Sequence, residues 1–531
     1  MSDKATVREG ASALPALLVD LVGADNVLTA DVDRQYMSTD LSFMPGEVAA
    51  CVIRPESTDE LAAAMRICAE AGVAVVPRGG GMSYTRGYVP QSADSVLVDM
   101  RRMNRIREIS TEDMYVTVEC GCTWKDLYEA LKEKGVRTPY YGPLSGMYAT
   151  VGGALSQNSL FLGSGIYNTA AESCLGLEVV LADGRVLQTG SGAHRNGKPF
   201  YRHFGPDLTG LFTADTGAFG FKTVATLRLV PSPAATEYLS FGFETLDAML
   251  AAQTAIARLR IASECYGFDP YYNSSFENMG FTLGEGVRML GKIARSGGLK
   301  GLRNSLKVAM SGRKVLSKVN YSLHMTFDGI DEEAARSSQA KAFELCTGAG
   351  GVEIDHSIPV AFRAEPFSGV RTILLGAEGE IWIPVHGFFP LSRARQAAEA
   401  TEKFIADNKP LMDKHGIKTS YLTAFSGSEF VIEPSFYWFD ELGPFRLDLI
   451  EPEFRERWKG IPADTQARDA VLKLRADLRD LFFELGACHL QLGKYYRFHD
   501  AMSNEETWRL LEGLKGLVDP AGRMNPGSLG L

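Results

Sequence analysis

The fold of this chain is decided by the stretch Pro77-Arg78-Gly79-Gly80-Gly81-Met82-Ser83-Tyr84. A short apolar run, Val73–Val76, precedes it, and a second one, Val96–Asp99, follows after several turn-forming residues. A Rossmann site requires a helix directly after the glycines, because the helix N-terminus receives the pyrophosphate. The glycines here predict a loop between two strands instead. Consecutive backbone N–H groups in such a loop can still hold an anion.

Helices and strands are both predicted around this loop. The stretch Ser57-Thr58-Asp59-Glu60 has the spacing of a capping box, so a helix is expected to begin there and to end at Gly72. Farther along the chain we expect a strand at Tyr115–Glu119, a helix at Thr123–Lys134 and a strand-like run in the glycine-rich stretch 142–158.

Two pairs of strands are predicted before Pro231. Apolar runs flank Asp183-Gly184, and this is the strongest short-range signal for a hairpin. We therefore expect Gly176–Leu181 to pair with Arg185–Thr189. A second strand pair is predicted within Gly217–Val230.

The middle of the chain has a different pattern, in which helical and strand-like stretches alternate. The predicted helices are Leu246–Arg260, Glu332–Cys346 and Ser392–Asn408, and the predicted strands are Ile381–Phe388 and Lys418–Phe425. This alternation indicates an antiparallel sheet covered by helices. A last helix is expected at Trp508–Val518, near the C-terminus.

Composition argues against several classes of protein. The 531 residues include 55 basic and 65 acidic side chains, and the net charge of −10 argues against a nucleic-acid-binding protein. No apolar run approaches the roughly 18 residues of a transmembrane segment, and the N-terminus lacks the layout of a signal peptide. The eight scattered cysteines predict reduced thiols in the cytoplasm, and they indicate neither a disulfide scaffold nor a metal site.

Five short motifs occur in this order along the chain: Pro77–Tyr84, Thr150–Ala154, Gly176–Gly184, Gly217–Thr223 and Asp519–Gly527. Their combination resembles the flavoprotein superfamily of vanillyl-alcohol oxidase and p-cresol methylhydroxylase (PCMH). The resemblance implies an α+β fold of two domains. A PCMH-type FAD-binding domain at 1–232 would be completed by the C-terminal segment 486–531. Residues 233–485 would form a substrate-binding cap, an antiparallel sheet covered by helices.

The resemblance also implies bound FAD. The expected cofactor-binding residues are Pro77, Arg78, Gly79, Gly80, Gly81, Met82, Ser83, Ser145, Thr150, Gly152, Gly153, Ser156, Gly217, Gly220, Phe221 and Asn525. Glycines 79–81 are expected to adopt positive φ and to let the backbone approach the pyrophosphate. Family members often bond the flavin to His, Cys or Tyr, but Met82, Tyr148 and Val431 or Ile432 stand at those places here. We therefore expect FAD to be held without a covalent bond.

The substrate-side residues implied by the resemblance are Tyr84, Tyr496 and Arg497, which would hold a para-substituted phenol as its phenolate. Alternatively, these side chains only pack, with Arg497 in a surface ion pair. Glu172 is the nearest carboxylate to the expected place of the catalytic base, or else it is a solvated loop residue. His386 would contact the substrate or the flavin edge, or else it is a core histidine on an apolar strand.

The main functional hypothesis is FAD-dependent oxidation of a para-hydroxylated aromatic alcohol or alkylphenol, of the phenylpropanoid or lignin-like kind. A hydride would pass to flavin N5, and O₂ or another acceptor would take the electrons. The aromatic stretch Glu433–Phe439 would be either core or the wall of a pocket for an aromatic substrate. The alternatives are a hydroxy-acid or polyol oxidoreductase and a flavin-binding protein without turnover. A homo-oligomer is expected in each case.

One segment departs from the acidic character of the chain. Residues 288–318 contain nine Lys and Arg side chains and no acidic one. Like charges repel, so we expect this segment to face water or to contact an anionic surface weakly.

Overall fold

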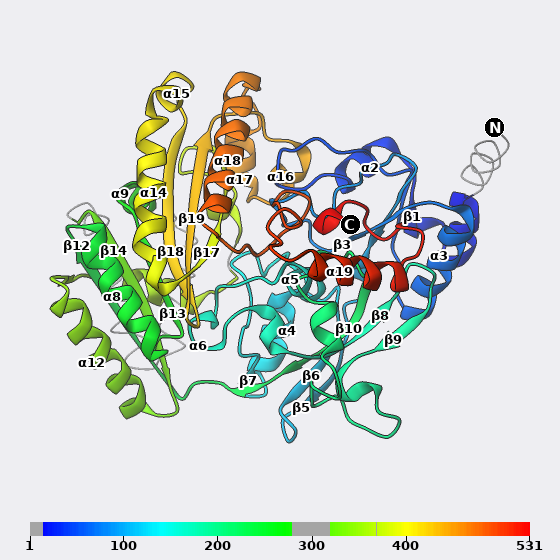
Figure 1. Ribbon diagram of the computed structural model, residues 1–531, viewed down its shortest axis with the longest axis horizontal. Helices are drawn as coiled ribbons and strands as arrows, with labels where there is room; N and C mark the ends of the chain where they lie inside the picture. The colour runs from blue at the N-terminus through cyan, green and yellow to red at the C-terminus, as the bar shows by residue number, and fades with distance from the viewer. Residues whose placement is uncertain (1–13, 279–318, 368) are drawn as a thin grey trace. The chain divides into compact units, whose positions relative to one another are not determined.

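The computed structural model describes residues 14–278, 319–367 and 369–531, so the basic segment 288–318 lies outside the described residues. The chain divides into two compact units, which can be followed by colour in Figure 1. The first unit contains Met1–Ser159, Thr169–Pro231 and Leu490–Leu531. The second contains Ser232–His489 together with the short segment Leu160–Asn168. The C-terminal tail therefore belongs to the same unit as the N-terminal residues.

A four-stranded sheet carries the glycine loop of the first unit. Its order is β1 (Val27–Leu28), β2 (Cys51–Ile53), β4 (Val96–Asp99) and β3 (Val75–Arg78). Both β2 and β3 run parallel to β4, and the glycine loop follows β3, which confirms the prediction of a loop between strands. Helix α3 (Thr58–Ala71) begins where Ser57 accepts a hydrogen bond from the Glu60 N–H and ends at Gly72, whose φ is 72°. Both predicted ends are confirmed.

The first unit also contains a five-stranded antiparallel sheet. Its order is β5 (Ile106–Ser110), β6 (Tyr115–Glu119), β10 (Phe221–Arg228), β8 (Cys174–Val180) and β9 (Val186–Gln188). The β8–β9 hairpin confirms the prediction around Asp183-Gly184. The strand pair predicted within Gly217–Val230 is wrong, since β10 pairs with β6 and β8, and β11 (Val230–Pro231) pairs with β7 (Val136–Arg137). No turn-forming residue interrupts β10, so it has no turn with which to fold back on itself.

The glycine-rich stretch 142–158 also differs from its prediction, because it contains helix α5 (Val151–Gln157). The Thr150 hydroxyl accepts a hydrogen bond from the Gly153 N–H, and Asn158 ends the helix in the left-handed conformation. Each glycine costs a helix about 1 kcal/mol relative to alanine. The N-cap offsets part of that cost, and a Cβ at Gly152 would lie only 2.7 Å from the Cβ of Cys120. Close packing against Cys120 therefore requires glycine at position 152. The N-cap at Thr150 sets where helix α5 begins.

The other helices of the first unit lie near the predicted positions or are short. They are α2 (Asp31–Met37), α4 (Trp124–Lys132), α7 (Leu208–Leu211) and α19 (Glu505–Val518). Helix α19 begins three residues before its predicted start, because the Asn504 side chain caps it by accepting from the Glu506 N–H.

An eight-stranded antiparallel sheet forms the second unit. Its path is β15 (Val352–Glu353), β12 (Ala235–Phe243), β14 (Tyr321–Gly329), β13 (Glu264–Phe268), β18 (Lys418–Ser426), β19 (Glu429–Trp438) and β16 (Ile381–Pro384), with β17 (Gly387–Pro390) also on β19. This confirms the predicted antiparallel sheet. The single strand predicted at Ile381–Phe388 is divided into β16 and β17 at Val385 and His386.

Helices cover the two faces of this sheet unequally. Long helices α8 (Leu246–Leu259), α12 (Glu332–Gly348), α14 (Ala394–Asp407) and α18 (Thr465–Glu484) lie on one face, three of them in front of the strands in Figure 1. Short helices α6 (Ser164–Tyr167), α9 (Pro270–Asn278) and α13 (Ser357–Ala364) contact the other face, the aromatic face. The remaining helices are α15 (Lys409–Lys414), α16 (Pro444–Asp448) and α17 (Pro452–Trp458).

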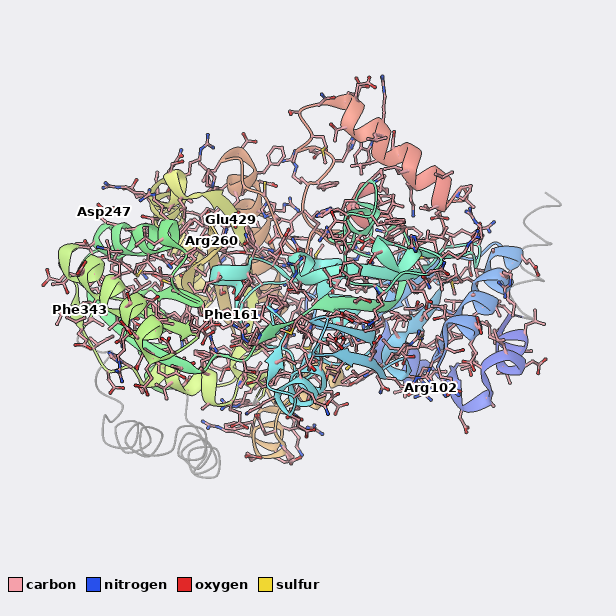
Figure 2. The ribbon with its side chains drawn as sticks, turned by 90° about the horizontal axis from the view of Figure 1, so that it is seen from below. Arg102, Phe161, Asp247, Arg260, Phe343 and Glu429 are labelled. Carbon is pink, nitrogen blue, oxygen red and sulfur yellow. The ribbon has the colours of Figure 1, made fainter. Side chains whose placement is uncertain are left out.

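The segment Leu160–Asn168 is joined to the second unit by hydrogen bonds at both ends. The Gly163 N–H donates to Glu264 (2.7 Å). Asn168 accepts from Arg260 (2.7 Å) and donates to Glu429 (3.1 Å), and both of these partners are labelled in Figure 2. No helix among the described residues is both long and apolar enough to cross a bilayer.

Candidate flavin and substrate sites

A cavity that is partly open to solvent, with about 410 Å³ of empty space including its open mouth, is lined only by residues of the first unit. The residues expected to bind FAD that line it are Pro77, Arg78, Gly79, Thr150, Gly152, Gly153, Ser156, Gly217, Gly220 and Phe221. Tyr88, Met100, Cys120 and Lys222 complete the lining, and the sequence did not point to them. Gly80, Gly81, Met82, Ser83, Ser145 and Asn525 were expected to bind FAD and are not among the lining residues.

Different structural features explain why glycine occupies positions 79, 80 and 81 of the loop. Only Gly81 has a positive φ, of 73°, so the expectation that all three glycines adopt this conformation is wrong for Gly79 and Gly80. A Cβ at Gly79 would lie 2.3 Å from the Thr150 hydroxyl oxygen, and one at Gly80 would lie 2.0 Å from the Tyr148 carbonyl oxygen. Glycine is therefore required at these two positions because the loop packs against the residues that lead into α5.

A buried ion pair supports another part of the cavity wall. The Lys222 ammonium donates to Asp215 at 2.7 Å, and the two side chains are 2% and 1% exposed. The same carboxylate accepts from the backbone N–H groups of Gly217 (3.0 Å) and Phe219 (3.4 Å). The ion pair thus holds the turn that carries Gly217 and Gly220 to the cavity. A lysine inside a run that forms a buried strand was the signal for it in the sequence.

Asn525 holds the C-terminal tail against two loops of the first unit. Its side-chain amide lies within hydrogen-bond distance of the carbonyl oxygens of Gly87 (2.9 Å) and Thr216 (2.7 Å). Its backbone N–H donates to the Val75 carbonyl oxygen at the start of β3. Asn525 therefore positions the loops that line the cavity and is not itself part of the lining.

The structure brings the segments of Tyr84 and Tyr496 together. The Lys494 N–H donates to the Thr85 carbonyl oxygen at 3.0 Å. Gly493 has a φ of 61°, and a Cβ there would lie 2.3 Å from the Thr85 hydroxyl oxygen. Both Tyr84 and Tyr496 are buried, whereas the Arg497 side chain is 37% exposed and pairs with Asp500 at 2.9 Å.

Lys494 is a titratable group in the same place that the sequence did not single out. Its ammonium donates to the Val89 carbonyl oxygen at 2.9 Å. Burial, followed by the nearby Arg86, lowers the pKa of Lys494 to about 7, and Asp40 opposes this shift. The amine can therefore gain or lose a proton near neutral pH.

Glu172 and His386 have contrasting surroundings. Glu172 is exposed on the turn Ala170–Ser173 and is not among the residues that line the cavity. His386 is buried in the second unit, and its carbonyl oxygen accepts a hydrogen bond from His489 at 2.7 Å. Burial lowers the pKa of His489 to about 4, so that imidazole is neutral at neutral pH.

The cavity lining fits an anionic dinucleotide such as FAD. The hydroxyls of Thr150 and Ser156 can donate hydrogen bonds, and the glycines leave backbone groups uncovered. Arg78 contributes a guanidinium that donates to the Thr39 carbonyl oxygen at 2.7 Å. Burial lowers the pKa of Arg78 to about 10, which still leaves it protonated at neutral pH.

Two protein-family models match the chain. The FAD binding domain matches residues 49–190, and the C-terminal domain of FAD linked oxidases matches residues 494–529. The glycolate oxidase subunit GlcD of Bacillus subtilis is 35% identical over 237 residues, which are 45% of this chain and 48% of that protein. A mitochondrial D-lactate dehydrogenase (cytochrome) of Arabidopsis thaliana is 32% identical over 236 residues, 44% of this chain and 39% of that protein. The chain thus spans half or less of the length of these relatives.

Solved structures extend the likeness in fold to nearly the whole chain. p-Cresol methylhydroxylase with substrate bound has a TM-score of 0.73 at 17% identity, over 98% of this chain and 97% of that chain. The isoeugenol complex of 4-ethylphenol oxidase from Gulosibacter chungangensis has a TM-score of 0.66 at 18% identity, with the same coverage. The α+β, PCMH-type fold expected from the sequence is confirmed. The matches of the FAD binding domain and of the C-terminal domain of FAD linked oxidases identify the chain as an FAD-linked oxidoreductase, and its fold is that of p-cresol methylhydroxylase.

Proposed function

We propose that this protein oxidises a para-hydroxylated aromatic alcohol or alkylphenol with FAD as the electron acceptor. The observation that supports this most directly is the packing of Gly493 and Lys494 on Thr85, which brings together the segments that carry the buried Tyr84 and Tyr496. Two phenolic O–H donors suit the oxygen of a phenol, and a nearby cation favours its ionised form. Lys494 and Arg497 are the cations nearest in sequence to Tyr496.

FAD, when bound, would supply the two-electron acceptor for a hydride from the benzylic carbon, which is attached to the ring para to the phenolic oxygen. The side chains of the first unit would hold and orient the phenol. Hydrogen bonds from Tyr84 and Tyr496 would lower the cost of removing the phenolic proton, and electron density would then move toward the para carbon. We propose that O₂ or another oxidant takes the electrons from the reduced flavin.

A second candidate is the oxidation of a 2-hydroxy acid. The identities of 35% and 32% to a glycolate oxidase subunit and a D-lactate dehydrogenase favour it. Those matches cover less than half of this chain. A small hydroxy acid would need a cationic partner for its carboxylate, a role open to Lys494 or Arg497.

Anaerobic reduction of the flavin separates the candidates. The purified protein, loaded with FAD, is mixed without oxygen with 4-hydroxybenzyl alcohol, 4-ethylphenol, D-lactate, glycolate or a simple sugar. We expect the visible flavin absorbance to bleach with the two phenols. Bleaching by the hydroxy acids alone would establish the second candidate, and no bleaching by any compound would indicate flavin binding without turnover.

We also infer that the protein works in a reducing compartment such as the cytoplasm. All eight cysteines are free, and seven of them are buried. Burial raises the pKa of Cys51 to about 11 and that of Cys68 to about 12, so these thiols stay protonated and unreactive.

A further inference from the structure

Two residues that the sequence did not single out, Tyr88 and Gln157, meet Ser156 at one side of the flavin cavity. Tyr88 and Ser156 line this cavity, and Gln157 follows Ser156 at the end of helix α5. Burial raises the pKa of the Tyr88 phenol far above its usual value, and the nearby side chains of Ser156 and Gln157 oppose this shift. Their polar atoms therefore lie close to the phenol oxygen, and we call these three side chains the polar corner.

The backbone around the polar corner is closely packed. The Gln491 N–H donates to the Gln157 carbonyl oxygen at 2.8 Å. A Cβ at Gly87 would lie 2.9 Å from the side-chain nitrogen of Gln157, and one at Gly217 would lie 3.5 Å from the Tyr88 ring. All of these contacts are made within the first unit. They hold the side chains of the polar corner in place before any ligand binds, which lowers the entropic cost of binding.

The polar corner has hydrogen-bonding capacity that the protein itself does not use. Gln157 is 7% exposed, and neither its amide nitrogen nor its amide oxygen makes a hydrogen bond of standard geometry with a described residue. The same is true of the Tyr88 hydroxyl, which is buried as well. Buried polar groups are normally paired, because an unmade hydrogen bond costs free energy. A ligand in the cavity can reach Tyr88 and Ser156, and the phenol can donate to it while accepting from the Gln157 amide.

The charges around the cavity favour a neutral ligand group at the polar corner. Asp215 acts on the Tyr88 phenol and raises its pKa further. Because Asp215 is paired with Lys222 at 2.7 Å, this side of the cavity offers no surplus positive charge to a phosphate. At the glycine loop, the N–H groups of residues 79–82 donate to no acceptor among the described residues, and the Arg78 side chain is close by. An anion therefore suits the glycine loop, and an uncharged polar group suits the polar corner.

We propose that the polar corner binds an alcohol group of FAD, on its ribityl chain or its ribose, through the hydroxyls of Tyr88 and Ser156. Each of these hydroxyls can donate one hydrogen bond and accept others, as an alcohol does, so the two kinds of group complement each other. The Tyr88 phenol stays protonated at neutral pH and so remains a donor. The inference concerns the cofactor alone, and it holds whichever substrate the flavin oxidises.

Equilibrium titration of the FAD-free protein with FAD compares Tyr88→Phe with the wild type. Loss of one hydrogen bond between uncharged groups should raise the Kd about 5- to 30-fold. Tyr140→Phe is the matched control, because Tyr140 is also buried with a hydroxyl that makes no standard hydrogen bond, but it is not among the residues that line the cavity. Its Kd should stay within about twofold of the wild-type value. Wild-type affinity in Tyr88→Phe overturns the assignment.

Analogues of FAD, each lacking one hydroxyl of the ribityl chain or of the ribose, identify the group that Tyr88 contacts. Removing the contacted hydroxyl should weaken binding to the wild type about 5- to 30-fold and should leave the affinity of Tyr88→Phe unchanged, because that variant has already lost the contact. The analogue with this pattern distinguishes the ribityl chain from the ribose. If Tyr88→Phe loses the same factor with every analogue, the phenol contacts another part of FAD and the proposal is wrong.

Unfolding experiments distinguish a cofactor contact from a structural role of Tyr88. Without FAD, Tyr88→Phe should have a denaturant midpoint equal to or above that of the wild type, since it removes a buried hydroxyl that lacks a standard partner. With excess FAD its midpoint should lie below that of the wild type, because weaker binding stabilises the fold less. A lower midpoint without FAD would assign Tyr88 to the structure. If Tyr88→Phe does not fold, Ser156→Ala replaces it in the titrations, and wild-type affinity in that variant overturns the proposal.

Discussion

The role of Arg497 depends on whether its guanidinium pairs only with Asp500 or also binds the substrate. Its guanidinium pairs with Asp500 at 2.9 Å, and about a third of the side chain is exposed. That ion pair is the surface arrangement considered from the sequence as the alternative to phenolate binding. An exposed pair of this kind contributes little to stability. A strong functional effect of changing Arg497 would therefore have to come from the substrate.

We expect Arg497→Met to lower kcat/KM for a phenol by roughly 30- to 1,000-fold while FAD content stays the same. Loss of a charge-assisted contact to a desolvated anion costs about 2–4 kcal/mol. Asp500→Asn is the control, because it breaks the ion pair and leaves the guanidinium in place. Steady-state kinetics in which Arg497→Met and Asp500→Asn behave alike would assign Arg497 to the surface.

Lys222 is the residue on which the cavity wall depends. We expect Lys222→Met to destabilise the first unit by about 3–5 kcal/mol and to weaken FAD binding, because Asp215 would remain as a buried charge without its partner. The double variant Asp215→Asn/Lys222→Met should recover part of the lost stability. Urea denaturation and FAD titration measure both effects.

Lys198→Met provides the comparison for Lys222. Lys198 pairs with Asp113 at 2.6 Å, but the two side chains are 65% and 35% exposed. Its loss should leave the free energy of unfolding nearly unchanged, because solvent screens an exposed pair. Equal effects at 222 and 198 would mean that the Lys222 pair is not important for the cavity wall.

At the scale of elements, helix α9 begins at a buried carboxylate. Asp269 accepts a hydrogen bond from the Tyr272 N–H at 2.7 Å. Burial raises the pKa of Asp269 to about 7, against the hydrogen bonds it accepts. In the unfolded chain this carboxyl group loses its proton near pH 4. The folded state therefore binds the proton more tightly than the unfolded state between about pH 4 and pH 7.

We expect the stability of the wild type to fall as pH rises from about 4 to 7, by on the order of 2–4 kcal/mol from this group. The stabilisation from Asp269 is complete at pH values below its pKa in the unfolded chain. It is lost as the pH rises through its pKa in the folded protein. Asp269→Asn should remove this part of the pH dependence. Denaturant midpoints at several pH values measure it, and an unchanged slope in the variant would assign the pH dependence to other groups.

At the scale of the whole molecule, the chain returns to its first unit after forming the second. Lys515 of α19 donates to the Ala218 carbonyl oxygen at 2.6 Å, and Asn525 bonds Gly87 and Thr216. These contacts join the last 40 or so residues to loops next to the cavity. The loops next to the cavity are therefore held by residues that come after the whole second unit in the sequence.

Asn525→Ala is expected to weaken FAD binding at least tenfold, since each buried hydrogen bond lost costs about 1 kcal/mol or more. Asn504→Ala is the matched control on the same tail, because it removes only the cap of α19. Equilibrium FAD titrations of both variants check the prediction. Equal losses in the two variants would indicate a general loosening of the tail.

The flavin itself is expected to leave the protein on unfolding. Met82, Tyr148 and Val431 or Ile432 stand where the resemblance noted from the sequence implies the attachment positions of a covalent flavin. Acid precipitation followed by centrifugation should leave the yellow colour in the supernatant. Flavin that stays with the pellet would show a covalent bond at some other residue.

Local signals in the sequence determined the capped helix α3, the β8–β9 hairpin and the loop after β3. Each of these depends on residues within a few positions of one another. The order of the glycine motifs along the chain added the expectation of an FAD-binding domain. The tertiary structure alone decided that Gly79 and Gly80 pack against the residues before α5 and that Lys222 lines the cavity. These relations join residues far apart in the chain. Strand register and loop packing, which a linear pattern does not contain, bring them together.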